Sequence, residues 1–174
     1  AAADGKVGNW GLGNEYEILA LLQKYDLPTD YLAEDFTMDG FDQDDITLEE
    51  CIKAKTEGHE IYVETCPQYL EFTCDVYKRE DGRNFVCSPP MKGQESQDAL
   101  WTALKAGFID TVATDHCPFQ SYEKDRGKDD FTKIPNGCAG IENLYPYMLD
   151  AANSGKISFE KAVEVCSTNP AKIF

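Results

Sequence analysis

The residues best suited to chemistry lie in segment 112–119, Val-Ala-Thr-Asp-His-Cys-Pro-Phe, where an apolar run ends in Asp115 and His116. The apolar run predicts a short buried strand, and catalytic groups of α/β enzymes gather where parallel strands end. A carboxylate there can bind a divalent cation and accept a proton from its bound water. Taken alone, Asp115 is better explained as an ordinary strand-end or helix-cap residue, and a lone histidine is usually structural.

Three other short segments place reactive or polar groups where the chain turns. Cys66 follows a predicted strand and could act as a nucleophile, but no histidine is near it in sequence. A buried structural cysteine is therefore the better interpretation. Ser88 begins a rigid Ser-Pro-Pro turn, and the Asn136-Gly137 pair suits the positive φ of a tight turn. Such turns expose backbone groups that can hold a small polar ligand, although a structural role explains them equally well.

Two further patterns near the N-terminus look like ligand sites without meeting the requirements of one. The glycines of segment 8–13 have no predicted strand before them and no Lys-Ser or Lys-Thr pair after them, so they do not predict a phosphate loop. The aspartates of segment 39–45 lack the alternating ligands and central glycine of an EF-hand. A solvated acidic loop is the preferred interpretation of segment 25–46.

The elements that position these groups are predicted from helical and alternating spacing of apolar residues. The predicted helices start at Asn14, run from a Thr47/Glu50 capping box to Gly58, span 96–106, lie around 144–152 with Asn143 as the cap, and span 159–166. The predicted strands are 61–65 and 109–113, with a possible strand at 72–77 and a possible extended segment at 85–87. A polar loop is predicted at 120–137. The alternation of strand and helix predicts a parallel sheet with helical crossovers. Two clear strands are too few to close a barrel.

Composition excludes several classes of function. The 174 residues carry 32 acidic and 16 basic side chains, a formal net charge of -16, which repels nucleic acid and anionic membranes. The apolar runs are only a few residues long, against the roughly 20 needed to cross a bilayer, and residues 1–10 do not look like a signal peptide. Seven cysteines without a CxxC pair indicate a reducing, cytoplasmic setting.

Taken together, the segments resemble the dihydropyrimidinases and hydantoinases. The resemblance covers residues 47–174, in the order and spacing of the family, whereas residues 1–46 form a separate segment without a match. It rests on the following residues and motifs: Ile-Tyr-Val-Glu-Thr-Cys-Pro-Gln-Tyr-Leu at 61–70, Val-Cys-Ser-Pro-Pro-Met at 86–91, Asp98, Leu100, Trp101, Leu104 to Gly107, Thr-Asp-His-Cys-Pro-Phe at 114–119, Lys128, Phe131, Ile-Pro-Asn-Gly at 134–137, Gly-Ile-Glu at 140–142 and Ser-Thr-Asn-Pro-Ala-Lys-Ile-Phe at 167–174.

The resemblance implies a fold, a reaction and a set of site residues. It implies an α/β fold, a partial (β/α)8 TIM-barrel-like domain made of the last strands and helices of the barrel. The family opens the amide bond of a small cyclic diamide with two divalent metals, usually zinc, and forms cytoplasmic homotetramers. By motif, Asp115 is the last metal ligand and the general base and acid. Ser88 and Asn136 hold the ring amide largely through backbone groups, and His116 makes no direct metal bond.

The chain departs from the family in its metal ligands. The family needs a His-x-His pair, a carboxylated lysine and two further histidines, whereas this chain has only His59 and His116. The chain also ends inside a motif that normally continues with Gly-Leu. These departures predict a fragment that lacks most metal ligands, does not retain zinc and is inactive alone.

Two non-catalytic hypotheses compete with the enzyme hypothesis. The collapsin response mediators share the fold without the metals, but they typically replace the strand-end aspartate and the asparagine of the Pro-Asn-Gly turn. This chain keeps both Asp115 and Asn136, which favours descent from an enzyme. The third hypothesis is a small acidic binding module built on a remodelled half-barrel.

Overall fold

The computed structural model describes residues 43–174, with side chains from residue 48 onward, and these residues lie in one compact unit. The helix predicted at Asn14, the glycines of segment 8–13 and most of acidic segment 25–46 lie outside the described residues. The end of that acidic segment is helical, because the first helix begins at Gln43.

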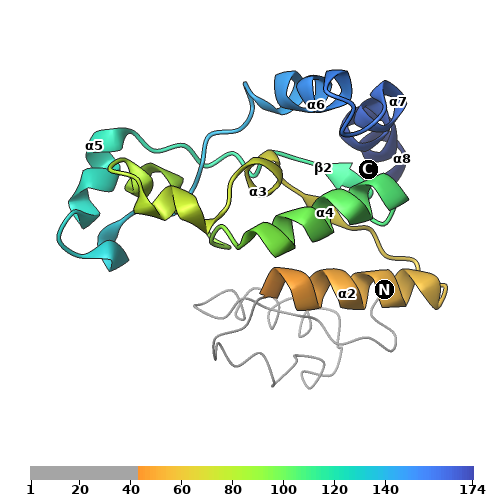
Figure 1. Cartoon of the computed structure of the whole chain (residues 1–174), viewed down its shortest axis with the longest axis horizontal. Helices are drawn as coiled ribbons and strands as arrows, with labels where there is room; N and C mark the ends of the chain where they lie inside the picture. Colours follow the sequence, from red (N-terminus) through yellow and green to blue (C-terminus); the bar gives the residue numbers. More distant parts are fainter. Residues whose placement is uncertain (1–42) are drawn as a thin grey trace, which may run out of the picture. The chain divides into compact units, whose positions relative to one another are not determined.

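Helices dominate the described part of the chain (Figure 1). The first half contains α2 (Gln43–Thr56), β1 (Glu64–Thr65), α3 (Pro67–Glu71), the 3₁₀ helices η2 (Cys74–Lys78) and η3 (Gly82–Phe85), α4 (Gln94–Ala106) and β2 (Thr111–Val112). The second half contains α5 (Ser121–Lys124), the 3₁₀ helices η4 (Asp125–Gly127) and η5 (Phe131–Lys133), α6 (Leu144–Asn153), α7 (Phe159–Val163), the π-helical turn η6 (Glu164–Thr168) and α8 (Asn169–Ile173).

The two predicted strands pair in parallel, as expected, with α4 between them in the chain. Glu64 lies opposite Thr111 and Thr65 lies opposite Val112. The paired stretch is shorter than predicted. At its start the Asp110 side chain accepts a hydrogen bond from the backbone N–H of Val63 at 2.7 Å, so a carboxylate takes a donor that a longer ladder would use. The architecture of the described residues is mixed α/β, with a two-stranded sheet that does not itself close a barrel.

Three local predictions are wrong. The helix predicted to begin at Thr47 begins at Gln43, so Thr47 lies inside α2. The possible strand 72–77 largely forms the 3₁₀ helix η2, in which Val76 is buried in a small apolar cluster. The polar loop 120–137 contains the helical turns α5, η4 and η5.

The main apolar core lies where α4, α6 and the π-helical turn η6 meet β2. Its largest fully buried side chains in the described part of the chain are Leu70, Leu104, Ile109, Met148 and Val165. The predicted helix 96–106 is confirmed as α4, which buries Trp101 and Leu104 on one face. The Trp101 indole Nε1 donates a 3.0 Å hydrogen bond to the carbonyl of Leu70, so α3 is fastened to α4 by a polar contact inside the core.

A second, smaller apolar cluster lies apart from the main core. It contains Val76, Cys87 and Met91, with Tyr69, Phe72, Phe85 and Cys138 packed against it. The Phe72 and Phe85 rings meet edge to face with centroids 4.9 Å apart. Figure 1 shows η2 and η3 gathered with α5 at one end of the described unit. This cluster supports the loops that carry the candidate site.

The last third of the chain is helical, as predicted. Asn143 precedes α6, and Pro146 falls in its first turn, where the absence of a proline N–H is tolerated. The predicted helix 159–166 is confirmed as α7 followed by a π-helical turn. Within residues 43–174 every helix is too short or too polar to span a bilayer.

Candidate active site

Three loop segments that carry candidate residues are held side by side by backbone hydrogen bonds. The N–H of Gly137 donates to the carbonyl of Val86 at 3.0 Å. The N–H of Cys117 donates to the carbonyl of Cys138 at 3.0 Å, and His116 forms a parallel bridge with Cys138. Segment 135–140 therefore lies against both segment 86–90 and segment 114–119.

Asp115 occupies an unusual backbone conformation close behind β2. Its φ is 44°, and it is the one non-glycine residue with positive φ among the described residues. Aspartate visits this left-handed region more readily than most residues because its short polar side chain can bond locally. The residue is exposed to solvent.

The negative charge of Asp115 raises the pKa of neighbouring thiols. Burial, together with the charges of Asp115 and Glu64, raises the pKa of Cys66 to about 12. Cys66 is therefore a protonated, buried thiol near neutral pH, and the nucleophile hypothesis loses its chemical basis. The structural interpretation of Cys66 agrees with this environment.

His116 has a positioning role. Its Nδ1 accepts hydrogen bonds from the backbone N–H of Gly140 at 3.0 Å and of Ile141 at 3.3 Å. An accepting Nδ1 carries no proton and is already occupied, so it is not free to bind a metal. His116 thus fixes the start of segment 140–142 against the turn that carries Asp115.

Ser88 and Asn136 are both exposed, and a buried side chain holds the segments in which they lie. The Lys124 Nζ donates to the carbonyls of Val86 at 2.7 Å and Pro135 at 3.1 Å. The lysine is only 2% exposed, and its burial lowers the pKa of the ammonium group. One buried cation therefore joins the two segments that carry the predicted ring-binding residues.

Sequence reasoning missed Lys124. It stands in a charged, polar stretch where nothing distinguishes it from exposed lysines. It missed Tyr69 as well, although the resemblance includes that residue. The Tyr69 hydroxyl donates to the carbonyl of Pro89 at 3.0 Å and so holds the turn that begins at Ser88.

The positive φ predicted for the Asn136-Gly137 pair is found at Gly137 alone, and no turn is assigned there. The φ of Gly137 is 149°, a conformation that side chains rarely adopt. A Cβ at this position would lie 2.3 Å from the carbonyl oxygen of Cys117, too close for any side chain. The glycine therefore allows segments 114–119 and 135–140 to pack closely.

The described residues do not by themselves fit the two-metal centre that the resemblance implies. Among them no group of three or more histidine, cysteine, aspartate or glutamate side chains could hold a metal ion. Asp115 offers one carboxylate, and the Nδ1 of His116 is already bonded to the backbone. A protein zinc site needs three or four ligands.

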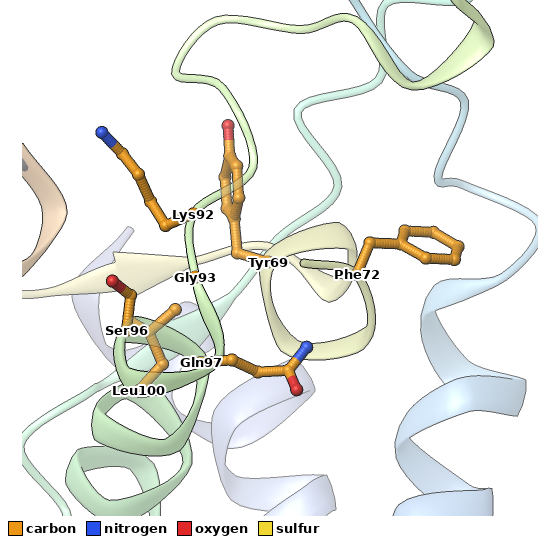
Figure 2. Close-up of a pocket in the computed structure, with 7 residues that line it drawn as sticks. All are labelled: Tyr69, Phe72, Lys92, Gly93, Ser96, Gln97 and Leu100. Carbon is orange, nitrogen blue, oxygen red and sulfur yellow. The ribbon is translucent and has the colours of Figure 1, made fainter. Parts of the chain in front are cut away.

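Two cavities of the described unit lie away from these residues. The pocket in Figure 2 lies between α3 and α4 and has a volume of about 10 Å³, the space of roughly one water molecule. The Tyr69 ring in that view extends away from α4. A groove of about 410 Å³ runs between α2 and α4 and is lined by Leu48, Ile52, Ala99 and Phe108 among others. Neither lining includes Asp115, Ser88 or Asn136.

Comparisons with known proteins identify relatives for this segment. The chain is 40% identical over 132 residues to a D-hydantoinase of Rhizobium radiobacter, covering 74% of this chain and 29% of the relative. It is 41% identical over 123 residues to a D-phenylhydantoinase of Escherichia coli, covering 70% of this chain and 27% of the relative. The crystal structure of the dihydropyrimidinase from Brevibacillus agri superposes with a TM-score of 0.69 at 41% identity, covering 72% of this chain and 28% of that one. No family model matches the chain.

The relatives bear the names of enzymes, so the non-catalytic alternative is not favoured. The chain spans less than a third of the length of the curated relatives it matches. Both the sequence identity and the structural similarity extend over more than 70% of this chain. The chain therefore belongs to the D-hydantoinase and dihydropyrimidinase family.

Proposed function

We propose that the protein that contains this segment hydrolyses the amide bond of a small cyclic diamide, a hydantoin or a dihydropyrimidine. Residues 47–174 supply the last strands and helices of its (β/α)8 barrel, and residues 1–46 form a separate segment. The protein works in the cytoplasm as a homo-oligomer, a tetramer by family resemblance. The observation that carries the proposal is the backbone pairing of segments 86–90, 114–119 and 135–140 in a chain about 40% identical to hydantoinases.

Asp115 is the proton carrier in this proposal. Ring opening adds water to an amide carbon, breaks the carbon–nitrogen bond and returns a proton to the leaving nitrogen. An exposed carboxylate can take the proton from the attacking water and deliver it to that nitrogen. The two divalent metals implied by the family, zinc by resemblance, need ligands besides the Asp115 carboxylate, and these lie outside the described residues.

Segments 86–90 and 135–140 bind the ring. A cyclic amide presents one N–H donor and one carbonyl acceptor, which backbone groups near Ser88 and Asn136 can pair with. Backbone groups bind with fixed geometry only when their loops are anchored. Lys124 and Tyr69 provide that anchoring from the buried side.

The first test removes the proton carrier from the full-length protein. Asp115→Asn keeps the shape of the side chain but cannot accept a proton, so we expect kcat to fall by about 10²-fold or more. The measurement is the absorbance change on opening of dihydrouracil and hydantoin rings. Asp129→Asn, the same change at another exposed aspartate, is the control and should leave kcat unchanged. Activity of Asp115→Asn within a few-fold of the parent would remove Asp115 from the mechanism.

The second test concerns the 174-residue chain alone. We expect no turnover of either ring, with or without added zinc, because the described residues supply fewer ligands than a metal centre needs. The full-length protein, assayed in parallel, should be active. Turnover by the short chain that a chelator abolishes would contradict the ligand assignment and reveal a metal site built from other residues.

A further inference from the structure

Two thiols from segments distant in sequence meet beneath the candidate site. Cys87 directly precedes Ser88, and Cys138 follows the Asn136-Gly137 turn. The hydrogen bond from the Gly137 N–H to the Val86 carbonyl joins the residues beside them. Both are free thiols of the small apolar cluster and interact with each other. The Cys87 Sγ donates to the carbonyl of Pro89 at 3.1 Å, and the Cys138 Sγ donates to the carbonyl of Phe85 at 4.0 Å.

The two thiols differ in exposure. Cys87 is 8% exposed and lies in the small apolar cluster with Val76 and Met91, whereas Cys138 is only partly buried at the edge of that cluster. Lys124, which donates to backbone carbonyls on both segments, places a positive charge beside the pair. An outer thiol next to an inner one, with a cation nearby, is the arrangement of a redox-active pair.

Exposure and electrostatics assign a separate role to each sulfur. The interaction with Cys87 is the main cause that lowers the pKa of Cys138, and the charge of Lys124 lowers it too, while burial and Asp115 oppose the shift. The interaction with Cys138, together with burial, raises the pKa of Cys87. Because Cys138 is also the more exposed thiol, it is the one that meets an oxidant from solvent, and Cys87 is the resolving thiol.

We propose that Cys87 and Cys138 form a reversible disulfide site, oxidised by hydrogen peroxide or an organic hydroperoxide. The Cys138 thiolate attacks one peroxide oxygen, the O–O bond breaks, and the leaving oxide is protonated to water or an alcohol. The sulfur of Cys87 then attacks the sulfenic acid sulfur of Cys138, its proton and the sulfenic hydroxyl leave as water, and the disulfide forms. The two sulfurs lose two electrons, which the peroxide gains.

The disulfide links the two loops that carry the proposed ring-binding residues. A disulfide holds its sulfur atoms about 2.0 Å apart, so oxidation fixes the separation of the two loop positions that carry Cys87 and Cys138. Cys138 is also paired through its backbone with His116 and Cys117, next to Asp115. Oxidation therefore constrains the site and lowers turnover, a consequence that rests on the proposed function, whereas the crosslink itself does not.

The chemical test uses the 174-residue chain. After peroxide treatment, proteolysis and mass spectrometry should show one peptide pair joined through Cys87 and Cys138, and dithiothreitol should release it. In Cys87→Ser a sulfenic acid should persist on Cys138 and react with dimedone, whereas Cys138→Ser should give no crosslink. Cys166→Ser, which removes a thiol buried in the main core, should crosslink like the wild type.

Two further readouts decide the assignment. Alkylation of Cys138 by iodoacetamide should rise with pH around a midpoint clearly below the ordinary thiol value of 9.0, in line with its lowered pKa. A crosslink between Cys138 and the neighbouring Cys117, a midpoint near the ordinary thiol value of 9.0, or oxidation without any crosslink would overturn the proposal.

The activity test uses the full-length protein and compares each variant with its own reduced form. The turnover of the oxidised wild type should fall by about ten-fold or more and recover with dithiothreitol. For Cys87→Ser the turnover after peroxide treatment should equal that of its reduced form. A crosslink that leaves turnover unchanged would overturn the regulatory consequence. A reduced protein that opens no ring would refute the proposed function while the crosslink result stands.

Discussion

Asp115 shows how a single residue can be constrained by both backbone and chemistry. Its positive φ turns the chain directly after β2, and its carboxylate is the group to which we assign the proton transfer. Most side chains resist this conformation, whereas asparagine and aspartate tolerate it. The need for a carboxylate and the need for a left-handed turn are thus met by the same residue type.

The backbone constraint predicts how substitutions at Asp115 affect stability. Asp115→Val should lower the free energy of unfolding by about 1–2 kcal/mol, because a β-branched residue clashes in the left-handed region. Asp115→Asn should change it by less than about 0.5 kcal/mol. Urea unfolding of the 174-residue chain measures both. Asp129→Val, which makes the same change where φ is not positive, is the control, and an equal loss there would show that strain is not the cause.

At the scale of the elements, Asp110 ties three parts of the fold together. Its carboxylate forms an ion pair with Lys55 of α2 and accepts a hydrogen bond from the N–H of Val63 ahead of β1. Its backbone carbonyl accepts a 2.9 Å hydrogen bond from the side chain of Asn169, the first residue of α8. The Asn-Pro pair near the chain end therefore has a structural role, because it anchors α8 to the start of β2.

Two lysines of α2 provide a matched test of this tie. The side chains of Lys55 and Asp110 are 16% and 19% exposed, whereas those of Lys53 and Glu50 are 62% and 68% exposed. Lys55→Met should lower the free energy of unfolding by about 1.5–3 kcal/mol, because it leaves a partly buried carboxylate without its cation. Lys53→Met should cost less than about 0.5 kcal/mol. Thermal or urea unfolding measures both, and equal costs would contradict the role of Asp110.

At the scale of the whole molecule, acidic charge dominates. The chain carries a formal net charge of -16, and the ion pairs Lys53–Glu50, Lys78–Asp75 and Lys133–Asp130 involve mostly exposed side chains. Exposed pairs contribute little to stability, whereas a large net charge opposes the compact state by self-repulsion. Repulsion should therefore outweigh attraction on this surface.

The charge predicts how stability depends on salt. Raising sodium chloride from about 0.01 M to about 0.15 M shortens the Debye length from about 30 Å to about 8 Å and screens the repulsion. We expect the Tm of the 174-residue chain to rise by a few degrees over this range. Scanning calorimetry measures the shift. A Tm that falls with salt would mean that ion pairs such as Lys55–Asp110 stabilise the fold more than the repulsion of the net charge destabilises it.

The sequence by itself determined the family, the parallel pairing of the two strands and the helices α4, α6 and α7. It did so because burial on one face of a helix or strand leaves a periodic pattern, and because motif order is retained along the chain. It also placed Asp115 shortly after a strand and indicated that Gly137 has a positive φ. These features depend on neighbours in the chain, which the sequence records directly.

Only the tertiary structure decided how Lys124, Cys87 and Cys138 are used. Lys124 is surrounded in sequence by charged, polar residues, yet its ammonium group is buried against carbonyls of two other segments. The two thiols meet although many residues separate them, and a contact between distant residues leaves no periodic pattern. Segment 72–77 makes the same point, because its strand-like composition was overridden by packing against the small apolar cluster. Local preference is weak compared with the burial that distant segments provide, so the contacts beneath the site are set by the fold.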